Sequence, residues 1–533
     1  MHLHLWNLRH WIVVVIASFC GVVCSWSAPV LLNPSLQLRL VLKTTNSSGA
    51  SSVRIAKDPR DNTLYYLQIN GDVWKVDLNP GAASTSVRVY SQANHALSSS
   101  VLGFAIGPDG VMYVLGNASN GKYTQATIVK GVPSGSTRVW TLLAHTQPYP
   151  LSNTAFDHLY SGLAVSADGA SLYVNCGSRT DHGEVEDNGG TFPNLRESPL
   201  TAKILRLPTH ASNLVLTNDL AILKASGYVY AEGTRNAFEL AFAPNGELFG
   251  TDNGPDRDMS DELNWIREGQ HYGFPWRMGG TDNPQQFSNY NPATDLLLDP
   301  RFVAVQSGRY HNDPTFSKAV TNFAEPVINH GPDANRFRNP ITGGIEVASA
   351  GATVSTFTAH RSPLGLVFDN GSMSPPFKGH AFVLGWTQGD ATANSVAGPF
   401  HDPGQDMCDL GLSKLGDTNY STTATRIVGG FANPIDAEII GNKVYVIEYG
   451  GNMGIWEVTF PPAISLGQPA RTTGGAFQFS VTEPPGLSTT VSASTNLAAW
   501  TPLTNFTPTN GQFTFTDPAA TNLPRRFYKV SSP

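Results

Sequence analysis

A histidine that directly follows an aspartate is the first candidate for chemistry in this sequence. Asp157 and His158 stand in the stretch Phe-Asp-His-Leu-Tyr-Ser-Gly-Leu, just before a predicted strand. Oxidising an alcohol by hydride transfer needs a base for the hydroxyl proton, and histidine titrates in the useful pH range. The neighbouring carboxylate could orient the imidazole. A purely structural Asp-His pair is the alternative, because adjacency in sequence alone defines no site.

An arginine and an acidic loop form the second group of candidates. Arg235 carries a permanent charge and a fixed fork of donors, so it can stabilise negative charge or brace the fold through salt bridges. Further along, Asp252-Asn253-Gly254-Pro255 is followed by Asp256, Asp258, Asp261 and Glu262. So much negative charge in one loop repels itself unless a cation or strong hydrogen bonding offsets it. The turn Tyr272-Gly273-Phe274-Pro275 closes this segment and can present backbone carbonyls.

The segment from Gly233 to Pro275 resembles the glucose/sorbosone dehydrogenase family. The members of this family are soluble sugar dehydrogenases that use pyrroloquinoline quinone (PQQ) and calcium on a six-bladed β-propeller. The matching pieces are Arg235-Asn236, Asn253-Gly254-Pro255, Asp261-Glu262-Leu263-Asn264 and Tyr272-Gly273-Phe274-Pro275. A repeated strand pattern extends the resemblance over residues 36–460.

The resemblance implies roles for particular residues. His158, in an Asp-His pair before a Ser-Gly strand, is implied as the catalytic base, with Asp157 beside it, and Arg235 and Asn236 are implied next to the quinone and substrate. Gly254 and Pro255 match the backbone ligands of the calcium that polarises PQQ. Asp261, Glu262 and Tyr272 fall in the region of a second, structural calcium. A hydrogen-bonded acidic loop without metal is the alternative.

The family pattern is incomplete on the side that holds the cofactor's carboxylates. Ser98 stands where the family has a glutamine, and Trp386-Thr387-Gln388 stands where it has a lysine. An arginine pair is replaced by Ala432-Asn433-Pro434-Ile435-Asp436, with only Arg426 nearby. Since PQQ carries three carboxylates, these changes leave its charge poorly compensated unless residues from insertions replace the missing ones. The candidates for that replacement are Arg336, Arg338 and Arg361.

The loop after the third predicted hairpin differs from the family as well. The family has an aspartate here that assists the histidine, whereas this chain has Ser178 directly after Gly177. The nearest acidic residues are Asp181 and Glu184, which with His182 could ligate a metal, although their spacing matches no specific metal signature. We therefore predict a solvated polar loop from residue 177 to residue 184.

The elements that must position these residues are predicted to be strands. An apolar strand, a turn that usually contains Asp-Gly or Asn-Gly, and a second strand recur six times, a pattern typical of hairpins. The copies are Val53 to Leu67, Gly103 to Leu115, Gly162 to Asn175, Glu239 to Thr251, Gly365 to Trp386 and Ile435 to Glu448. We expect an all-β six-bladed β-propeller, because one blade alone cannot bury its faces. An array of β-sandwiches is the alternative.

The two ends of the chain differ from the middle. Arg9 and His10 precede an apolar run, and small residues follow it, so residues 1–28 are predicted to be a signal peptide of a secreted or periplasmic protein. An uncleaved anchor is the alternative; after cleavage no membrane span is expected. Residues 463–533 are rich in Ser, Thr, Asn and Pro and resemble a small C-terminal β-sandwich module.

Composition restricts the possible functions. Charged residues make up 14% of the chain and the net charge is −7, which argues against nucleic-acid binding, since that needs a basic face. Two functions remain. One is a PQQ- and calcium-dependent oxidoreductase for a sugar or polyol, and the other is a non-redox, calcium-bearing propeller that binds a glycan or a protein. A calcium-dependent hydrolase on the same architecture would need a central metal site that these motifs do not assemble.

Overall fold

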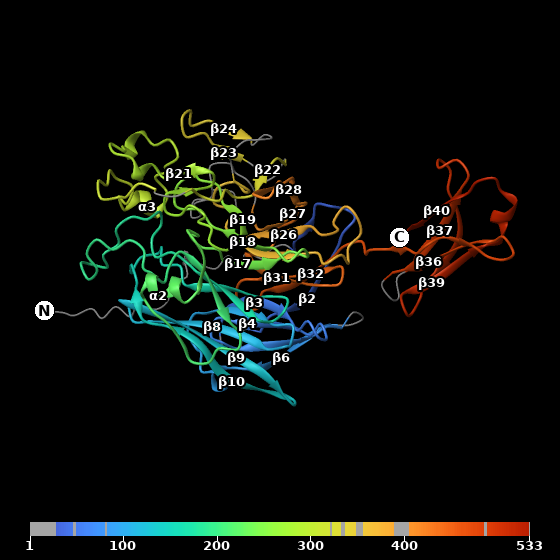
Figure 1. Cartoon of the computed structure of the whole chain (residues 1–533), viewed down its shortest axis with the longest axis horizontal. Coiled ribbons are helices and arrows are strands. Elements are labelled where there is room, and N and C mark those ends of the chain that lie inside the picture. Colours follow the sequence, from blue (N-terminus) through green and yellow to red (C-terminus); the bar gives the residue numbers. More distant parts are fainter. Residues whose placement is uncertain are drawn as a thin grey trace, which may run out of the picture.

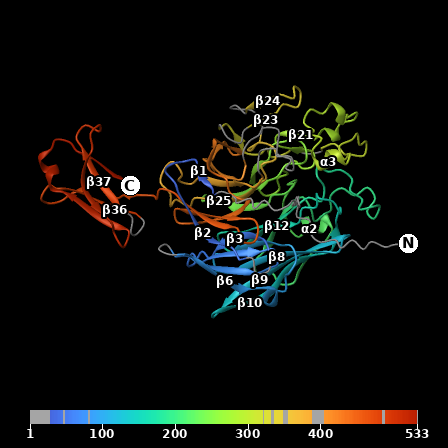
Figure 2. The ribbon, with the colours of Figure 1, turned by 180° about the vertical axis from the view of Figure 1, so that it is seen from behind.

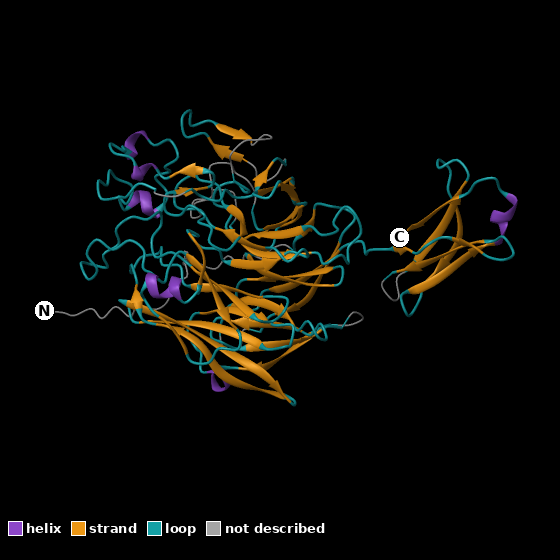
Figure 3. Ribbon diagram, viewed as in Figure 1, coloured by secondary structure: helices purple, strands orange, loops and turns teal. Residues whose placement is uncertain are grey.

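The fold is built almost entirely from strands. The computed structural model describes residues 28–45, 49–79, 83–319, 322–331, 336–347, 355–387, 404–483 and 488–531. Strands dominate these residues, and the few helices are short and lie in the connections (Figure 3). The all-β fold class is therefore confirmed. Residues 1–27 lie outside the described residues, so the signal peptide stays a prediction.

Six sheets contain the main strands of the part before residue 460. The first has β3 (Ser52–Lys57), β4 (Leu64–Gln68), β5 (Val73–Asp77) and β6 (Thr85–Tyr90). The second has β7 (Val101–Ile106), β8 (Met112–Ser119), β9 (Tyr123–Ser134), β10 (Thr137–Thr146), β11 (Tyr149–Pro150) and β15 (Leu214–Leu216). The third has β12 (Tyr160–Val165), β13 (Ser171–Cys176), β14 (Lys203–Pro208) and β16 (Val229–Glu232).

The other three sheets follow the same order of strands. The fourth has β17 (Glu239–Phe242), β18 (Leu248–Asp252) and β19 (Glu262–Ile266). The fifth has β25 (Pro363–Phe368), β26 (Ala381–Gly385), β27 (Asp406–Leu410) and β30 (Ala424–Gly429), with β1 (Val30–Leu31) at its edge. The sixth has β31 (Pro434–Ile440), β32 (Lys443–Glu448) and β33 (Gly454–Thr459), with β2 (Gln37–Lys43) at its edge.

The first strands of the six sheets contact one another in cyclic order. β3 packs against β7, β7 against β12, β12 against β17, β17 against β25, β25 against β31, and β31 against β3. Both faces of each sheet are covered in this way; for example, Val53 and Leu67 of the first sheet share an apolar cluster with Val101, Phe104 and Val114 of the second. The strands β1 and β2 join the start of the chain to its fifth and sixth sheets.

The predicted hairpins are confirmed. Each of the six predicted segments is a pair of antiparallel strands: β3 with β4, β7 with β8, β12 with β13, β17 with β18, β25 with β26, and β31 with β32. In three of the turns the glycine has a positive φ, 78° at Gly110, 71° at Gly169 and 83° at Gly246. Glycine adopts this conformation without steric cost, which is why Asp-Gly and Asn-Gly mark these turns.

Small elements fill the connections between the sheets. The strands are β20 (Arg277–Met278), β21 (Thr281–Asp282), β22 (Ile328–Asn329), β23 (Arg336–Arg338), β24 (Ile345–Val347), β28 (Ser413–Leu415) and β29 (Asn419–Thr422). The helices are α1 (Gln92–His95), α2 (Leu220–Ala225), α3 (Val303–Gln306), η1 (Pro284–Gln286) and η2 (Pro292–Thr294). Most of them belong to the long excursion between β19 and β25, which lies at the top of Figure 1.

The last part of the chain has its own core. One sheet has β34 (Ser465–Leu466), β35 (Ala470–Arg471), β36 (Phe477–Thr482) and β39 (Gln512–Asp517), and another has β37 (Thr489–Ser494), β38 (Thr501–Phe506) and β40 (Phe527–Ser531), with η3 (Pro518–Asn522) after β39. Phe479 and Phe515 from one sheet share a cluster with Val491 from the other. This part stands apart from the rest in both views (Figures 1 and 2).

Two further observations concern cysteines and membranes. Cys176 and Cys408 are both buried and form no disulfide, and burial raises the pKa of the Cys176 thiol to about 12. They are therefore packed as small apolar side chains rather than joined. Within the described ranges, no helix is both long and apolar enough to cross a membrane.

Candidate active site

Loops at one end of the strand ring bring the first candidates together. His158 lies just before β12, Ser178 lies just after β13, and Arg235 lies in the loop before β17. The backbone N–H of His158 donates to the Ser178 carbonyl over 2.8 Å, and the Ser178 N–H donates to the Arg235 carbonyl over 2.7 Å. Gly177 makes this contact possible, because a Cβ there would lie 2.4 Å from the His158 Cβ. His158 and Arg235 therefore lie on adjoining backbone segments.

The imidazole of His158 is neutral. Burial lowers its pKa to about 3, and the charge of Arg235 acts in the same direction. Its Nδ1 lies 3.3 Å from both the carbonyl oxygen and the hydroxyl oxygen of Ser178. A proton on Nδ1 can be donated to the carbonyl, and this tautomer leaves Nε2 as a proton acceptor. This tautomer is the one that a base needs, whereas the lowered pKa makes His158 a weaker base than an ordinary imidazole.

The depressed pKa of His158 leads to a prediction about stability. Below its ordinary pKa of 6.5 the unfolded chain binds a proton that the folded chain rejects until about pH 3. The free energy of unfolding should therefore fall as the pH falls through this window. We expect His158→Gln to remove this component of the pH dependence in urea unfolding between pH 4 and pH 7. If the free energy of unfolding depends equally steeply on pH in the wild type and in His158→Gln, the prediction is wrong. His271→Gln should reduce the pH dependence in the same way, because burial lowers the pKa of His271 to about 4.

Asp157 has partners other than the imidazole. Its two carboxylate oxygens accept hydrogen bonds from the backbone N–H groups of Ser152, at 2.8 Å, and Asn153, at 2.9 Å. Burial raises the pKa of this carboxyl. These bonds close the turn before His158, so they fix the backbone from which the histidine projects. Orientation of the imidazole by the Asp157 carboxylate stays a prediction.

Arg235 is held by an aspartate that the site prediction did not include. Its Nε donates to the Asp181 carbonyl at 2.7 Å, its Nη2 lies 3.0 Å from the Asp181 carboxylate, and its Nη1 donates to the Asn253 carbonyl at 3.2 Å. Burial opposes ionisation of Asp181, but the hydrogen bond from His182 and the charge of Arg235 together lower its pKa to about 2. Arg235 therefore forms a buried ion pair with Asp181.

The predicted solvated loop is wrong. Asp181, His182 and Glu184 are exposed by only 0%, 3% and 1%. The physical reason is Arg179, whose side chain turns inward and donates to backbone carbonyls on both sides of the loop, among them Leu151, at 2.9 Å, and others at Pro150, Glu186, Leu195 and Arg196. A side chain that satisfies so many carbonyls can draw a polar loop into the interior.

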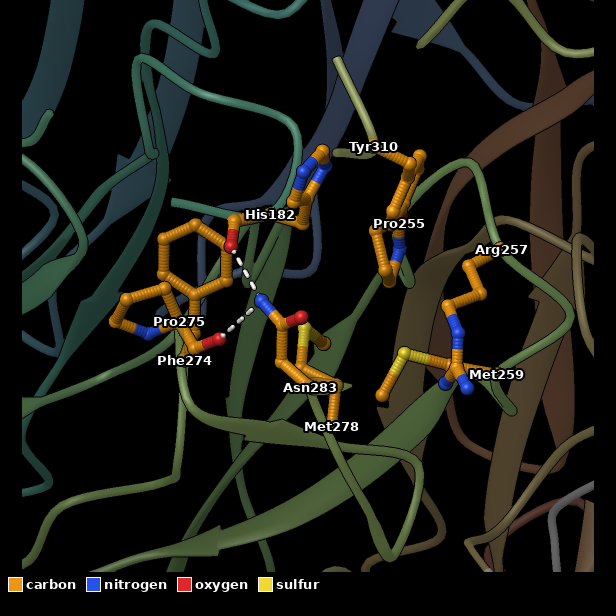
Figure 4. Close-up of a pocket in the computed structure, with 9 residues that line it drawn as sticks. All are labelled: His182, Pro255, Arg257, Met259, Phe274, Pro275, Met278, Asn283 and Tyr310. Atoms are coloured by element: carbon orange, nitrogen blue, oxygen red, sulfur yellow. Dashed lines mark hydrogen bonds between the residues drawn. The ribbon is translucent and has the colours of Figure 1, made fainter. Parts of the chain in front are cut away.

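The buried loop meets the long excursion. The Tyr310 hydroxyl donates to the Asp181 carboxylate at 3.2 Å, and its ring stacks on His182 with a centroid distance of 3.8 Å. Figure 4 shows the two rings face to face and Asn283, which donates to the His182 carbonyl at 2.8 Å. The cavity of about 10 Å³ beside them has room for about one water molecule. Tyr310 could not be assigned from sequence, because it lies far from Asp181 along the chain.

Asp252 organises the Arg235-Asn236 turn. Its carboxylate accepts from the backbone N–H of Arg235 at 2.9 Å and of Asn236 at 2.5 Å. Burial raises the pKa of Asp252 to about 6 despite these bonds. The structure thus places the Asn236 backbone beside Arg235, whereas its predicted contact with a cofactor stays a prediction.

The Pro255 carbonyl and the Asp261 carboxylate, two of the predicted calcium ligands, already accept hydrogen bonds from the chain. Gly254 N–H donates to Asp261 at 2.6 Å, and the second oxygen of Asp261 accepts from the Ser362 N–H at 3.0 Å. The Pro255 carbonyl accepts from the Arg257 N–H at 2.7 Å. Within the described part of the chain, no group of three or more His, Cys, Asp or Glu side chains could hold a metal ion.

Glu262 and Tyr272, two of the three residues predicted for the second calcium site, are both buried; Glu262 begins β19 and Tyr272 follows that strand. Glu262 accepts from the Gly279 N–H at 2.6 Å and from Asn264 Nδ2 at 2.9 Å, and burial, followed by the charge of Asp252, raises its pKa to about 8. The Tyr272 hydroxyl donates to the Trp265 carbonyl at 2.5 Å. Hydrogen bonding and protonation therefore offset the acidic charge here, and calcium at these residues stays a prediction.

A second ion pair crosses the centre of the ring beneath these loops. Arg54, on β3, pairs with Glu239, on β17, and its Nε donates to the Leu102 carbonyl, on β7, at 2.7 Å. β3 and β17 are opposite members of the cyclic series of strands. Asp436, on β31, adds a further carboxylate whose pKa burial raises to about 6. These side chains close the centre of the ring below His158 and Arg235.

The side chains do not fit the three carboxylates of PQQ. Four arginines of this region lie against carboxylates: Arg54 against Glu239, Arg235 against Asp181, and both Arg361 and Arg426 against Asp406. Arg338 pairs with Asp258, and Trp386, which replaces the family lysine, is uncharged. The cationic side of the site is therefore largely neutralised within the protein itself.

The fold and the site define an all-β protein with a polar site where loops of a strand ring converge. Residues 138–307 match the family model described as Glucose / Sorbosone dehydrogenase. This match confirms the resemblance that the sequence motifs indicate, and it covers all the predicted site residues.

The chain is also similar to individual proteins. Quinoprotein glucose dehydrogenase B of Acinetobacter calcoaceticus is 27% identical over 266 residues, which cover 45% of this chain and 53% of that protein. The match thus spans about half the length of that relative. Soluble aldose sugar dehydrogenase from Escherichia coli, in the apo form, has 14% identity and a TM-score of 0.46, covering 80% of this chain and 99% of that one. The PQQ domain of pyranose dehydrogenase from Coprinopsis cinerea, in the holo form, has 12% identity and a TM-score of 0.48, covering 81% and 97%.

Proposed function

We propose that this chain is an oxidoreductase that acts on a hydroxyl group of a sugar or polyol. The observation that carries the proposal is the neutral His158, whose backbone and Nδ1 both contact Ser178 and which thereby lies next to Arg235. Similarity to sugar dehydrogenases gives the substrate class.

The residues of the chain have separate tasks in this proposal. Nε2 of His158 takes the proton of the hydroxyl that is oxidised, and a bound redox cofactor would accept the hydride from the carbon that bears this hydroxyl. Arg235 offers N–H groups of its fork to an oxygen on which negative charge develops, while Asp181 and Asn253 hold its orientation. Burial around His158 excludes water from the reacting hydroxyl and strengthens both interactions.

The architecture is part of the proposal. We infer a six-bladed β-propeller over residues 36–460, because six sheets pack through their first strands in cyclic order. We also infer a β-sandwich module over residues 463–533, since two sheets share one apolar cluster there. Secretion follows from the predicted signal peptide at residues 1–28.

The resemblance to sugar dehydrogenases implies PQQ and calcium as cofactors. The ion pairs that neutralise the arginines argue against the binding of PQQ. We therefore also propose a second function, that of a non-redox propeller that binds a glycan or protein. The observation that favours it is that Arg54, Arg235 and Arg361 already pair with carboxylates, so little positive charge is left for a tricarboxylate.

Titration of the purified chain with PQQ and calcium distinguishes the two functions. If the chain is an oxidoreductase of this kind, we expect quinone absorbance to show stoichiometric binding, and a dye to be reduced when aldoses are added. Binding of sugar without quinone binding or dye reduction would support the second function. Arg235→Ala is expected to abolish ligand binding at this site in either case, and His158→Ala to abolish only the reduction of the dye.

A further inference from the structure

Ser178 lies between His158 and Arg235 and is completely buried. It follows Gly177 directly after the end of β13. Its carbonyl accepts from the His158 N–H, and its own N–H donates to the Arg235 carbonyl. These two bonds hold the peptide backbone of Ser178 on both sides, so its side chain projects from a fixed position beside the imidazole.

The hydroxyl group of Ser178 can point its proton in only one direction. Its Oγ lies 2.9 Å from the carbonyl oxygen of Thr180. A carbonyl oxygen only accepts, so the single hydroxyl proton must lie between these two atoms, and the lone pairs of Oγ are left as acceptors. Thr180 is itself held by Glu197, whose Oε1 accepts from the Thr180 N–H at 3.1 Å. The fold therefore sets the direction of the Ser178 hydroxyl.

Two acceptors face the same nitrogen of the imidazole. Nδ1 of His158 lies 3.3 Å from the carbonyl oxygen of Ser178 and 3.3 Å from its Oγ. An Nδ1 without a proton would set its lone pair against the lone pairs of both oxygens, whereas an Nδ1–H group can donate to them. Burial and the charge of Arg235 keep the ring neutral. A neutral ring with its proton on Nδ1 has an unprotonated Nε2.

Within the described part of the chain, no carboxylate is hydrogen-bonded to the imidazole of His158. The neighbouring Asp157 carboxylate accepts instead from the backbone N–H groups of Ser152 and Asn153. A carboxylate at Nδ1 would favour the charged imidazolium, whereas a carbonyl and a hydroxyl oxygen favour a neutral ring of one tautomer. Ser178 can thus determine where the proton lies without adding charge.

We propose that Ser178 is a positioning residue for His158: its hydroxyl, directed by the Thr180 carbonyl, fixes the proton on Nδ1 and keeps Nε2 as the acceptor. The consequence for catalysis rests on the proposed function, since Nε2 is the atom that takes the substrate proton there. The tautomer does not depend on that function, because it follows from hydrogen bonds within the chain.

The test observes the tautomer directly. In the full chain with nitrogen-15-labelled histidine, NMR at pH 7 distinguishes a protonated ring nitrogen from an unprotonated one, and His158→Gln assigns the signals. We expect the wild-type proton on Nδ1. Ser178→Ala removes one of the two acceptors, so the share of the Nε2–H form should rise about fivefold, the effect of one lost hydrogen bond. Ser178→Thr keeps the hydroxyl and should show the wild-type tautomer.

A second buried serine provides the matched control. Ser161, 2% exposed on β12, accepts from Asn175 Nδ2 at 3.0 Å, so Ser161→Ala should leave the tautomer of His158 unchanged. The NMR result needs neither substrate nor cofactor, so it decides the inference even if the proposed function fails. If the chain oxidises sugars, Ser178→Ala should also lower kcat severalfold and leave KM unchanged.

Two results would overturn the inference. One is a wild-type His158 that carries its proton on Nε2 or protons on both nitrogens at pH 7. The other is a Ser178→Ala variant that keeps the wild-type tautomer, since the hydroxyl would then have no part in fixing the proton.

Discussion

His158→Ala should lower the rate of sugar-dependent dye reduction by about 10²–10⁴-fold, the usual contribution of a positioned general base. Any affinity for sugar or for PQQ that the wild-type chain shows should remain, because the side chain that is removed makes its contacts with Ser178 rather than with Arg235. The measurement is kcat with a panel of aldoses, together with the affinities of both ligands. Because the pKa of His158 is about 3, the wild-type rate should show no loss from protonation of this residue between pH 5 and pH 8.

Asp157→Asn provides the matched control. The structure uses the Asp157 carboxylate to accept from Ser152 and Asn153, so an amide oxygen should keep part of this turn and most of the rate. If Asp157→Asn lowers the rate of dye reduction as much as His158→Ala does, Asp157 acts on the imidazole, as the sequence suggests. If His158→Ala retains the wild-type rate, His158 is not the base.

Arg54→Met should destabilise the chain by about 3–5 kcal/mol, the usual cost of removing one partner of a buried ion pair. Arg54 is 2% exposed, and it pairs with Glu239 across the ring, donates to Leu102 and lies 4.0 Å from the centroid of the Phe238 ring. Its removal leaves two carboxyl groups, Glu239 and Asp436, without their positive neighbour. The measurement is equilibrium unfolding in urea at pH 7.

Arg206→Met is the control for this prediction. Arg206 pairs with Glu268, and the two side chains are 32% and 60% exposed, so its loss should cost less than about 1 kcal/mol. Arg54→Met at low pH gives a second readout. Protonation of the two carboxyl groups removes the unpaired charge. The difference in the free energy of unfolding between Arg54→Met and the wild type should therefore shrink as the pH falls. If Arg54→Met lowers the free energy of unfolding by less than about 1 kcal/mol at pH 7, the ion pair does not stabilise the ring.

Much of the strand structure could be predicted from local pattern. The hairpins depend on alternating apolar residues and on Asp-Gly or Asn-Gly turns, and both signals lie within a few residues of each other. The structure bears them out in all six predicted pairs, from β3 and β4 to β31 and β32. By contrast, β38 was not predicted, since Pro502 and the exposed side chains of this strand give no strand signal.

The polar residues were harder to assign. The loop with Asp181, His182 and Glu184 has the composition of a solvated loop, and its burial depends on distant partners such as Arg235 and Tyr310 and on the inward side chain of Arg179. The acidic residues Asp261 and Glu262 suggested a cation, yet their oxygens accept from N–H groups of the chain itself. Composition states how much charge a loop carries, but not which donors the fold brings to it.

The sequence by itself determined the all-β class, the hairpins, and the presence of a histidine and an arginine at strand starts in the pattern of sugar dehydrogenases. Only the tertiary structure decided that Asp181 holds Arg235, that Tyr310 covers Asp181, and that Arg54 meets Glu239 across the ring. The physical reason is the distance along the chain: turn and strand preferences act between near neighbours, whereas an ion pair forms between segments that meet only when the sheets close into a cycle.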